Sequence, residues 1–405
     1  MKICLISRTY PPHIGGPGST AYQVSESLRE MGHRIFIVTQ SAIGRKFHEK
    51  YDGLDVFRAP FPPLHKGTFN FLPWIVGASS LSAIALYVVR KYDVDIVHSM
   101  DVSLGAIAGS VSHKVAPRPS YLLRYGGDFP YEVACLLKPE GWDPKKGVEA
   151  SWNLPDFRIK MAYSLQIHHS KIYDFMLPNT KHGERLLLHM GVPPHKIRLV
   201  PYGVNTEMFS PTTDGRELKS KFISPIILSG GRMDPWKGFD VLLKAVSIVQ
   251  EDLGSVSVVI LGEGHDKNNL QKLASGLGIA HAHFPGAVRH DMIPRFLAAA
   301  DVFVSPSFSN IGFPNILLEA MASGKPIISS RIPGVEEYLE HLKTGVLFQS
   351  GNIEELAHHI KTLLQDQKTS RKIGINARRL TLEKFSWDKM MERLLAVYDE
   401  ALNRP

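Results

Sequence analysis

Short apolar runs of strand length alternate with amphipathic helical stretches along almost all of this 405-residue chain. One such helix carries its apolar residues on a single face, at positions Phe239, Leu242, Leu243, Val246 and Val249. Parallel strands need a crossover connection, and a helix usually supplies it, so this alternation is typical of parallel sheets covered by helices. The sequence therefore predicts an α/β fold of doubly wound sheets, and its length suffices for two domains.

The predicted strands fall into two groups. The first group comprises residues 2–7, 34–39, 56–59, 96–99, 120–123, 175–178 and 197–200, and the second comprises 226–229, 256–261, 283–284, 302–305, 327–329 and 345–348. Between the groups, residues 205–222 are polar and contain Pro211 and Gly215, which is typical of a linker.

The stretch from 312 to 326 predicts a loop and a short helix whose first turn can bind an anion. Pro314 suits that turn because its missing N–H costs nothing, and the N–H groups of Asn315 and Ile316 remain free at the positive end of the helix dipole. A phosphate is the expected ligand. Glu319 lies one turn further on the same face, where it can accept hydrogen bonds from hydroxyls attached to that phosphate, as in a nucleotide's ribose.

A second candidate loop follows the strand predicted at 226–229. It contains Gly231, Arg232 and Lys237, and it leads into a helix. Open α/β sheets bind ligands at the carboxyl ends of their strands. The guanidinium of an arginine can form two parallel hydrogen bonds to a phosphate, and the ammonium group of a lysine adds a compact positive charge, so the pair suits a diphosphate. The alternative interpretation is two solvated surface cations.

A third glycine-rich loop, residues 16–21, follows the first strand and matches the G-x-G-x-x-A form of a dinucleotide fingerprint. This pattern favours a rival class, an NAD-dependent oxidoreductase. The second strand, however, ends in Val38, Thr39 and Gln40, without the acidic residue that holds the ribose of such a cofactor. The oxidoreductase is therefore the remote alternative.

The ordered set of motifs resembles the retaining glycosyltransferases of family 4, also called glycosyl transferases group 1, which have the GT-B fold. The motifs that carry the resemblance are Gly15-Gly16, Met31-Gly32-His33, Asp95-Ile96-Val97-His98, Val200-Pro201-Tyr202-Gly203-Val204-Asn205, Phe209-Ser210-Pro211, Gly231-Arg232, Lys237-Gly238, Leu261-Gly262-Glu263-Gly264 and the 312–326 stretch. Each motif is weak alone, but the ordered set covers nearly the whole chain.

The resemblance implies two Rossmann-like domains. Residues 1–204 would form the acceptor-side domain, 205–222 the linker and 223–385 the nucleotide-sugar donor domain, with a final helix at 386–405 packing back on the first. It also implies the activity, which is transfer of a sugar from a nucleotide-diphosphate sugar to an acceptor with retention of anomeric configuration.

The resemblance assigns site residues as well. The donor-binding set is Gly15, Gly16, Arg232, Lys237, Gly262, Val288, Asn310, Gly312, Phe313, Pro314, Asn315, Ile316 and Glu319. Arg232 and Lys237 are also expected to be catalytic, because they would receive the charge of the departing diphosphate. The remaining catalytic candidates are His98, with a structural histidine as its alternative, and Asp128, the polar group nearest to a position where relatives carry a His-Gly pair.

One departure concerns the Glu-x7-Glu pair of the family, because Ile311 stands where the first glutamate is usual. Asn310 is the adjacent polar side chain and the expected substitute. The departure affects the choice of donor sugar or activity itself. It favours the alternative of a non-catalytic nucleotide-sugar binding protein. A nucleotide-sugar hydrolase or epimerase of the same fold is a separate alternative.

Charge and cysteine content constrain the partners and the compartment of the protein. Residues 1–200 hold 24 Lys and Arg against 16 Asp and Glu, so the first half carries the entire net charge of +8. We expect a phosphorylated or lipid-linked acceptor, or contact with an anionic membrane, and no nucleic acid. Cys4 and Cys135 are too few for a disulfide framework, and the N-terminus lacks the apolar core of a signal peptide, which favours the cytoplasm, with peripheral contact at the inner face of the membrane.

Two absences complete the expectations. The adjacent pairs His168-His169 and His358-His359 cannot each face one way, and no His/Cys cluster has metal-ligand spacing, so no obligatory metal or other cofactor is expected. Residues 67–89 contain no charged side chain, but Pro73 and Gly77 interrupt the run, which predicts a buried crossover helix rather than a membrane span.

Overall fold

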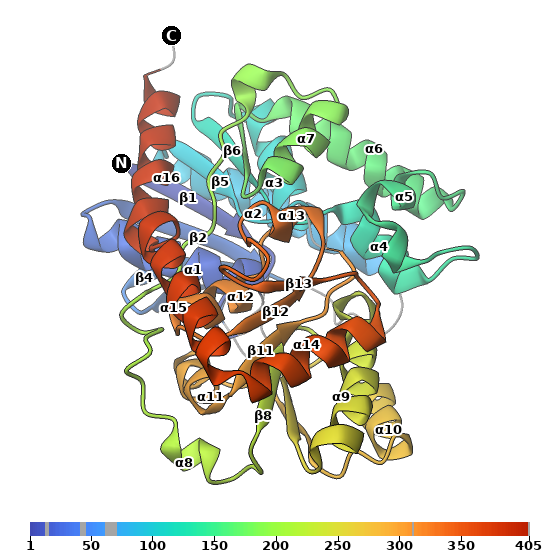
Figure 1. Ribbon diagram of the computed structural model, residues 1–405. Helices are drawn as coiled ribbons and strands as arrows, with labels where there is room; N and C mark the ends of the chain where they lie inside the picture. The colour runs from blue at the N-terminus through green and yellow to red at the C-terminus, as the bar shows by residue number, and fades with distance from the viewer. Residues whose placement is uncertain (13–15, 41–45, 61–70, 310–311, 404–405) are drawn as a thin grey trace. The chain divides into compact units, whose positions relative to one another are not determined.

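The computed structural model describes residues 1–12, 16–40, 46–60, 71–309 and 312–403 (Figure 1). The chain forms two compact units. Unit 1 comprises Met1–Trp142, Glu149–Pro201 and Met391–Pro405, and unit 2 comprises Asp143–Val148 and Tyr202–Met390.

The sheet of unit 1 has the strand order β3-β4-β2-β1-β5-β6-β7. Its strands are β1 (Lys2–Ser7), β2 (Arg34–Gln40), β3 (His48–Tyr51), β4 (Leu54–Ala59), β5 (Ile96–Ser99), β6 (Ser120–Tyr125) and β7 (Phe175–Pro178). All neighbours pair in parallel except β3, which runs antiparallel to β4. Residues Ile3 to Ile6 of the central strand are fully buried, as expected for a sheet covered on both faces.

Helices connect these parallel strands. They are α1 (Gly16–Glu30), α2 (Phe71–Tyr92), α3 (Leu104–Val115), α4 (Phe129–Leu137), α5 (Val148–Trp152), α6 (Phe157–Ile172) and α7 (Lys181–His189), with the 3-10 turn η2 (Pro194–Lys196). Residues 71–89 of the uncharged stretch lie in α2, which packs against α3, β2 and β4 as a crossover helix. Within the described ranges, none of the helices has the length and apolar content needed to span a bilayer.

The sheet of unit 2 has the order β10-β9-β8-β11-β12-β13, and all its neighbours are parallel. Its strands are β8 (Ile226–Gly230), β9 (Ser257–Leu261), β10 (Ala282–Gly286), β11 (Val302–Ser305), β12 (Ile327–Ser330) and β13 (Val346–Phe348). The helices are α8 (Arg216–Lys219), α9 (Phe239–Leu253), α10 (Lys267–Gly276), α11 (Ile293–Ala299), α12 (Asn315–Ala322), α13 (Pro333–Glu336), α14 (Ile353–Gln365) and α15 (Gln367–Lys384), with 3-10 turns η1 (Pro144–Lys146), η3 (Pro235–Lys237) and η4 (His290–Met292).

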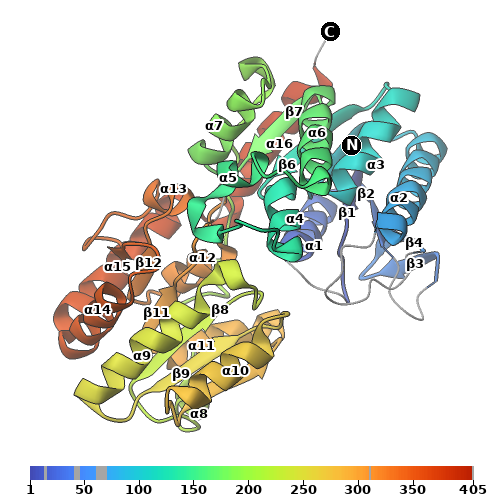
Figure 2. The ribbon, with the colours of Figure 1, turned by 90° about the vertical axis from the view of Figure 1, so that its right-hand side faces the viewer.

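Two apolar clusters cover the two faces of this second sheet. One contains residues of α9, α10 and α14, and the other contains residues of α11, α12 and α15. Figure 2 shows α9 and α10 beside β8 and β9. Each unit is thus a doubly wound α/β sheet, as predicted. The last helix, α16 (Trp387–Leu402), has its first residues in unit 2 and belongs to unit 1 from Met391 onward.

Two local expectations need correction. Residues 16–21, expected as a glycine-rich loop, lie in α1, which begins at Gly16. A Cβ on Gly18 would lie 2.7 Å from Thr9 Oγ1, so this first turn is tightly packed. Residues 197–200, expected as a strand, lie beside β7. The N–H of Arg198 donates to Met176 O, and the N–H of Val200 donates to Pro178 O. These residues form no complete strand, because Pro178 has no N–H with which to donate in return.

Residues 205–222, the expected linker, make specific contacts within unit 2. Phe209 is only 1% exposed, and Nη1 of Arg378 donates to its carbonyl oxygen at 2.7 Å. Helix α8 also lies in this stretch. The polar composition of the segment did not indicate these contacts, because they depend on one buried aromatic residue and on an arginine that is distant in the sequence.

Candidate active site

The strand order of unit 2 reverses direction between β8 and β11, so these neighbours form the topological switch point of the sheet. Ligands of open α/β sheets bind outside the carboxyl ends of the strands at such a point. The loop after β8 and the loop after β11 both leave from this edge. A Cβ on Gly230 would lie 2.6 Å from Cδ1 of Ile316, so the start of α12 packs directly against the end of β8.

The two loops also touch each other. Gly238 has φ +67°, and a Cβ there would lie 2.1 Å from the carbonyl oxygen of Pro306. The N–H of Phe308 donates to Trp236 O at 2.9 Å. Two motifs separated by about 80 residues in the sequence therefore form one continuous edge, as the switch-point rule predicts.

Backbone hydrogen bonds join the loops after β8, β9 and β10. The N–H of Gly231 donates to Leu261 O at 2.9 Å, and the N–H of Gly262 donates to Gly286 O at 2.8 Å. Gly262 has φ +123°, and a Cβ there would lie 2.0 Å from Gly231 O. Only glycine fits this position, so Gly262 has a steric function in shaping the edge.

Arg232 and Lys237 lie on this edge. The guanidinium of Arg232 forms an ion pair with the carboxylate of Asp234 and lies 5.0 Å from the ring centroid of Trp236. Its side chain is 49% exposed, whereas that of Asp234 is 3% exposed. A Cβ on Gly231 would lie 3.9 Å from Cε of Lys237, so both cations flank the same glycine. Sequence reasoning missed Asp234, although it lies two residues after Arg232 in the same motif.

The 312–326 stretch forms the expected loop and helix, with Pro314 as the residue before the first helical position. The N–H groups of Leu317 and Leu318 both donate to Pro314 O, at 3.0 and 3.2 Å, so the helix begins directly after Pro314 and the positive end of its dipole lies there, which favours an anion. Phe313 is 2% exposed and packs against Tyr338 and Phe385. Its side chain therefore anchors the loop, and a ligand at this position would meet backbone atoms.

Glu319 is 8% exposed and has a partner that the sequence analysis did not identify. Nε2 of His290 lies 2.8 Å from Oε1 of Glu319. Burial lowers the pKa of His290, but the hydrogen bond and charge of Glu319 outweigh it and raise that pKa above its ordinary value. The position of His290 shortly after β10, at the same sheet edge, was the one signal that could have indicated it.

His98 of unit 1 is completely buried. Its Nδ1 lies 2.7 Å from the hydroxyl of Tyr398 on α16. Burial and the nearby charge of Arg124 lower the pKa of His98 to about 3, so its ring is neutral at physiological pH. These contacts correspond to the structural alternative: the ring attaches the final helix to the sheet of unit 1.

Asp128 caps the start of α4 and is 3% exposed. Its carboxylate accepts hydrogen bonds from Tyr131 N–H at 2.8 Å, Trp152 Nε1 at 3.2 Å and Gln166 Nε2 at 2.7 Å. Burial outweighs these bonds and raises the pKa of Asp128 to about 6. Since both oxygens are engaged internally, the carboxylate is better suited to positioning α4 than to meeting a substrate.

Unit 1 has its own switch point, between β1 and β5. Asp101, which sequence reasoning missed, bridges the loops after these strands by accepting from Arg8 N–H at 2.7 Å and Gly105 N–H at 3.1 Å. Gly16 opens α1 at this edge, and a Cβ there would meet nothing within 4 Å. Gly15, Asn310 and Ile311 lie outside the described residues.

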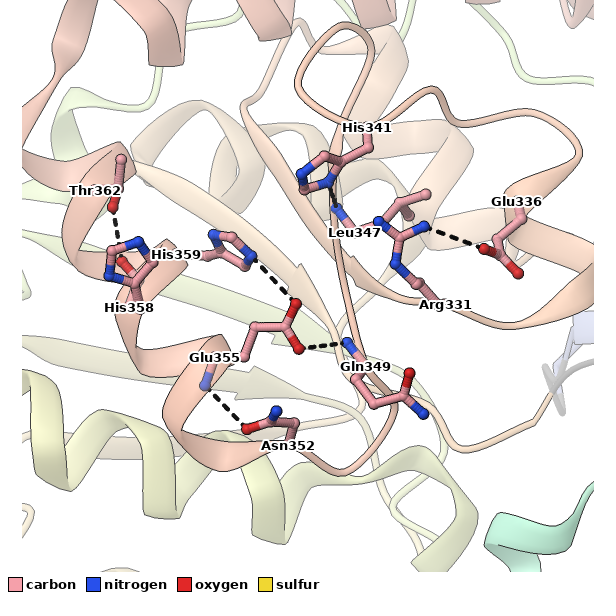
Figure 3. Close-up of polar contacts among 10 residues, drawn as sticks. All are labelled: Arg331, Glu336, His341, Leu347, Gln349, Asn352, Glu355, His358, His359 and Thr362. Carbon is pink, nitrogen blue, oxygen red and sulfur yellow. Dashed lines mark hydrogen bonds and ion pairs between the residues drawn. The ribbon is translucent and has the colours of Figure 1, made fainter.

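Three histidines of unit 2, His341, His358 and His359, lie around α14 (Figure 3). Nε2 of His359 lies 3.7 Å from Glu355 Oε1, and the His341 and His359 rings are 5.9 Å apart between centroids. The carbonyl oxygen of His358 accepts from the Thr362 hydroxyl at 2.9 Å, and the His358 and His359 rings are inclined by 58° with centroids 5.5 Å apart. Across the ranges that the structure describes, no group of three or more His, Cys, Asp or Glu side chains is placed to hold a metal.

Two family models match the chain. The model described as "Glycosyl transferases group 1" matches residues 214–380, and "Glycosyl transferase 4-like domain" matches residues 15–203, so together they cover well over half of the sequence. The chain is 26% identical to a sulfoquinovosyl transferase of Arabidopsis thaliana, over 89% of this chain and 66% of that protein. It is also 26% identical to the MMP alpha-(1->4)-mannosyltransferase of Mycolicibacterium hassiacum, over 100% of this chain and 99% of that protein.

Solved structures resemble the chain over nearly its full length. Sucrose-phosphate synthase of Thermosynechococcus elongatus has a TM-score of 0.81 at 19% identity and covers 98% of both chains. The HepE protein of Anabaena, in complex with UDP-glucose, has a TM-score of 0.78 at 17% identity and covers 99% of this chain and 100% of its own. At these identities the likeness concerns the fold, and it confirms the predicted architecture of two Rossmann-like domains.

Proposed function

Since the chain belongs to the glycosyl transferases of group 1 and has the GT-B fold, we propose that it transfers a sugar from a nucleoside-diphosphate sugar to an acceptor with retention of anomeric configuration. The observation that carries the donor part of this proposal is the joined edge of unit 2. There the loops after β8 and β11 meet at the switch point, with two cations on one loop and a helix start on the other.

The diphosphate of the donor would bind between Arg232, Lys237 and the first N–H groups of α12. Asp234 supports this role because its buried carboxylate orients the Arg232 guanidinium. The stacking of that guanidinium on Trp236 restrains it further. A restrained cation loses less side-chain entropy when an anion binds, which favours affinity and precise placement.

The nucleoside would lie along the loops after β9 and β10. Glu319 would accept hydrogen bonds from the ribose hydroxyls, Gly262 would let the backbone approach closely, and the base would contact the segment that contains Val288. Gly312, at the start of the 312–326 stretch, would lie near the sugar, and Asn310 would take over the role of the glutamate that Ile311 replaces.

The chemistry at this edge is stabilisation of a leaving group. Negative charge gathers on the diphosphate as the bond between the anomeric carbon and its oxygen breaks. Fixed donors aimed at that charge lower the barrier because they stabilise the transition state more than the ground state. Arg232, Lys237 and the α12 N–H groups are such donors, and this scheme assigns no step to a metal.

Unit 1 would bind the acceptor. Residues 1–200, most of which belong to unit 1, contain the excess of Lys and Arg, which supports a phosphorylated or lipid-linked acceptor and peripheral contact with an anionic membrane surface. The cytoplasm, at the inner face of the membrane, is the compartment consistent with this acceptor class.

The test begins with thermal unfolding of the full chain in the presence of UDP, GDP, ADP and their sugar conjugates. A ligand present at a hundred times its dissociation constant adds about 2.7 kcal/mol of stability, so the matching nucleotide should raise Tm clearly. Release of the nucleoside diphosphate from the matching sugar is then measured with and without candidate acceptors. Release that depends on an acceptor supports transfer, release without an acceptor indicates a hydrolase, and binding without release indicates a non-catalytic protein.

A further inference from the structure

The carboxylate of Glu319 is held from one side before any ligand arrives. Glu319 lies on α12, and His290 belongs to η4, 29 residues earlier in the chain. Their contact, 2.8 Å between Nε2 and Oε1, engages only one of the two carboxylate oxygens. Since the Glu319 side chain is 10% exposed, its freedom to choose another orientation is small.

His290 is itself fixed by an aromatic contact. Its ring packs edge-on against Phe209, with centroids 5.3 Å apart and an interplanar angle of 60°. Arg378 then secures Phe209 by donating from Nη1 to its carbonyl oxygen at 2.7 Å and to the carbonyl oxygen of Ala322 at 2.6 Å. Ala322 is the last residue of α12, so this helix is supported at its end and, through His290, at Glu319.

We propose that His290 is a positioning residue for nucleoside recognition, which holds Glu319 so that its carboxylate can accept hydrogen bonds from the ribose hydroxyls of the donor. The inference rests on the proposed function, because it assigns Glu319 to the ribose. It adds a residue outside the motifs that the sequence analysis assigned to the donor site.

The surroundings of His290 favour this role over a purely electrostatic one. The acidic neighbour Asp291 is paired with Arg289, and Phe209 brings no charge to the ring. Glu319 is therefore the carboxylate to which His290 donates among the contacts of the described residues. Loss of the donor atom should leave the orientation of the Glu319 carboxylate less firmly fixed, and the ribose would then meet a less ordered acceptor.

The experiment compares two substitutions at one position. His290→Leu removes the donor with little change in volume, whereas His290→Gln keeps a nitrogen donor that can reach Glu319. His281→Leu, on the segment before β10, is the matched control because the same substitution is made at the opposite end of that strand. Each variant is titrated calorimetrically with UDP, GDP and ADP and with their 2′,3′-dideoxy counterparts.

The wild type should bind the better ribonucleotide about tenfold or more tightly than its dideoxy form, the scale of hydrogen bonds to a charged group. His290→Leu should reduce this preference to about twofold or less, while His290→Gln and His281→Leu should retain it. Thermal unfolding of each variant without ligand checks that the fold persists.

Different failures have different meanings. If none of the three nucleotides binds the wild type, the proposed function and this inference are both overturned. If the wild type prefers the ribonucleotide and a folded His290→Leu variant keeps that preference, the inference alone is overturned. A wild type that binds both forms equally would remove Glu319 from ribose recognition, and the role of His290 with it.

Discussion

Arg232 is held by an ion pair with Asp234, whose carboxylate is almost completely buried two residues away. The arrangement keeps a half-exposed cation at the switch point of unit 2, where the leaving diphosphate is proposed to lie. We expect Arg232→Ala and Lys237→Ala each to reduce turnover by about a hundredfold to a thousandfold, the scale of losing one preorganised donor. Steady-state kinetics with the matching donor measure this, and unchanged thermal unfolding of both variants provides the control. Near-normal turnover in both stable variants would contradict the diphosphate assignment.

Gly262→Ala should destabilise unit 2. The new Cβ would lie 2.0 Å from Gly231 O, and a φ of +123° is unfavourable for alanine. We expect a loss of about 2–4 kcal/mol in the free energy of unfolding. Gly276→Ala is the matched control, because it lies in α10 with nothing within 4 Å of a Cβ, and helical alanine is favoured over glycine. Equal stability of the two variants in urea denaturation would show that the contact yields easily.

Acid should destabilise the protein in part through His98. Its pKa is lowered to about 3 by burial, whereas the unfolded chain takes up the proton near 6.5. Between these values the unfolded state binds more protons, so stability rises with pH and is lost as pH falls from about 6.5 towards 3. The loss is about 1.4 kcal/mol per pH unit for this one group. The free energy of unfolding, measured with denaturant at several pH values, should decrease less steeply towards acid pH for His98→Gln than for the wild type. Equal slopes for the two proteins would argue against a buried neutral histidine.

Membrane contact should follow the charge of the first half of the chain. Residues 1–200 carry the whole excess of +8, so binding to liposomes should increase with their anionic lipid content and decrease with salt. Sedimentation of the protein with phosphatidylglycerol vesicles, compared with phosphatidylcholine vesicles, measures this. If the protein ignores anionic vesicles at low salt, the membrane part of the proposal is wrong.

The backbone of the candidate site could be predicted from short-range patterns. Gly231, Arg232 and Lys237 were expected on one strand-end loop, and Pro314 and Glu319 on one short helix, because strand, turn and helix-start signals act over a few residues. The alternation of strands and helices then implied that both loops reach the carboxyl edge of one parallel sheet. The domain boundaries and the ligand roles of these residues stay predictions.

Short-range sequence patterns could not predict which side chains pack against each other. The two active-site candidates in unit 1 illustrate this, since His98 donates to or accepts from Tyr398, 300 residues away, and Asp128 is enclosed by Trp152 and Gln166. A strand-end position identifies which edge a residue is near, but it does not determine which face its side chain occupies or what covers it.

The sequence by itself determined the doubly wound α/β architecture, the glycine-rich and cationic loops and the helix start, because each depends on local backbone preference and apolar periodicity. Only the tertiary structure decided that His290 contacts Glu319, that Asp234 pairs with Arg232 and that Phe209 anchors residues 205–222. Those contacts join side chains from different elements, and their geometry depends on how the sheets and helices pack together, which no short stretch of sequence specifies.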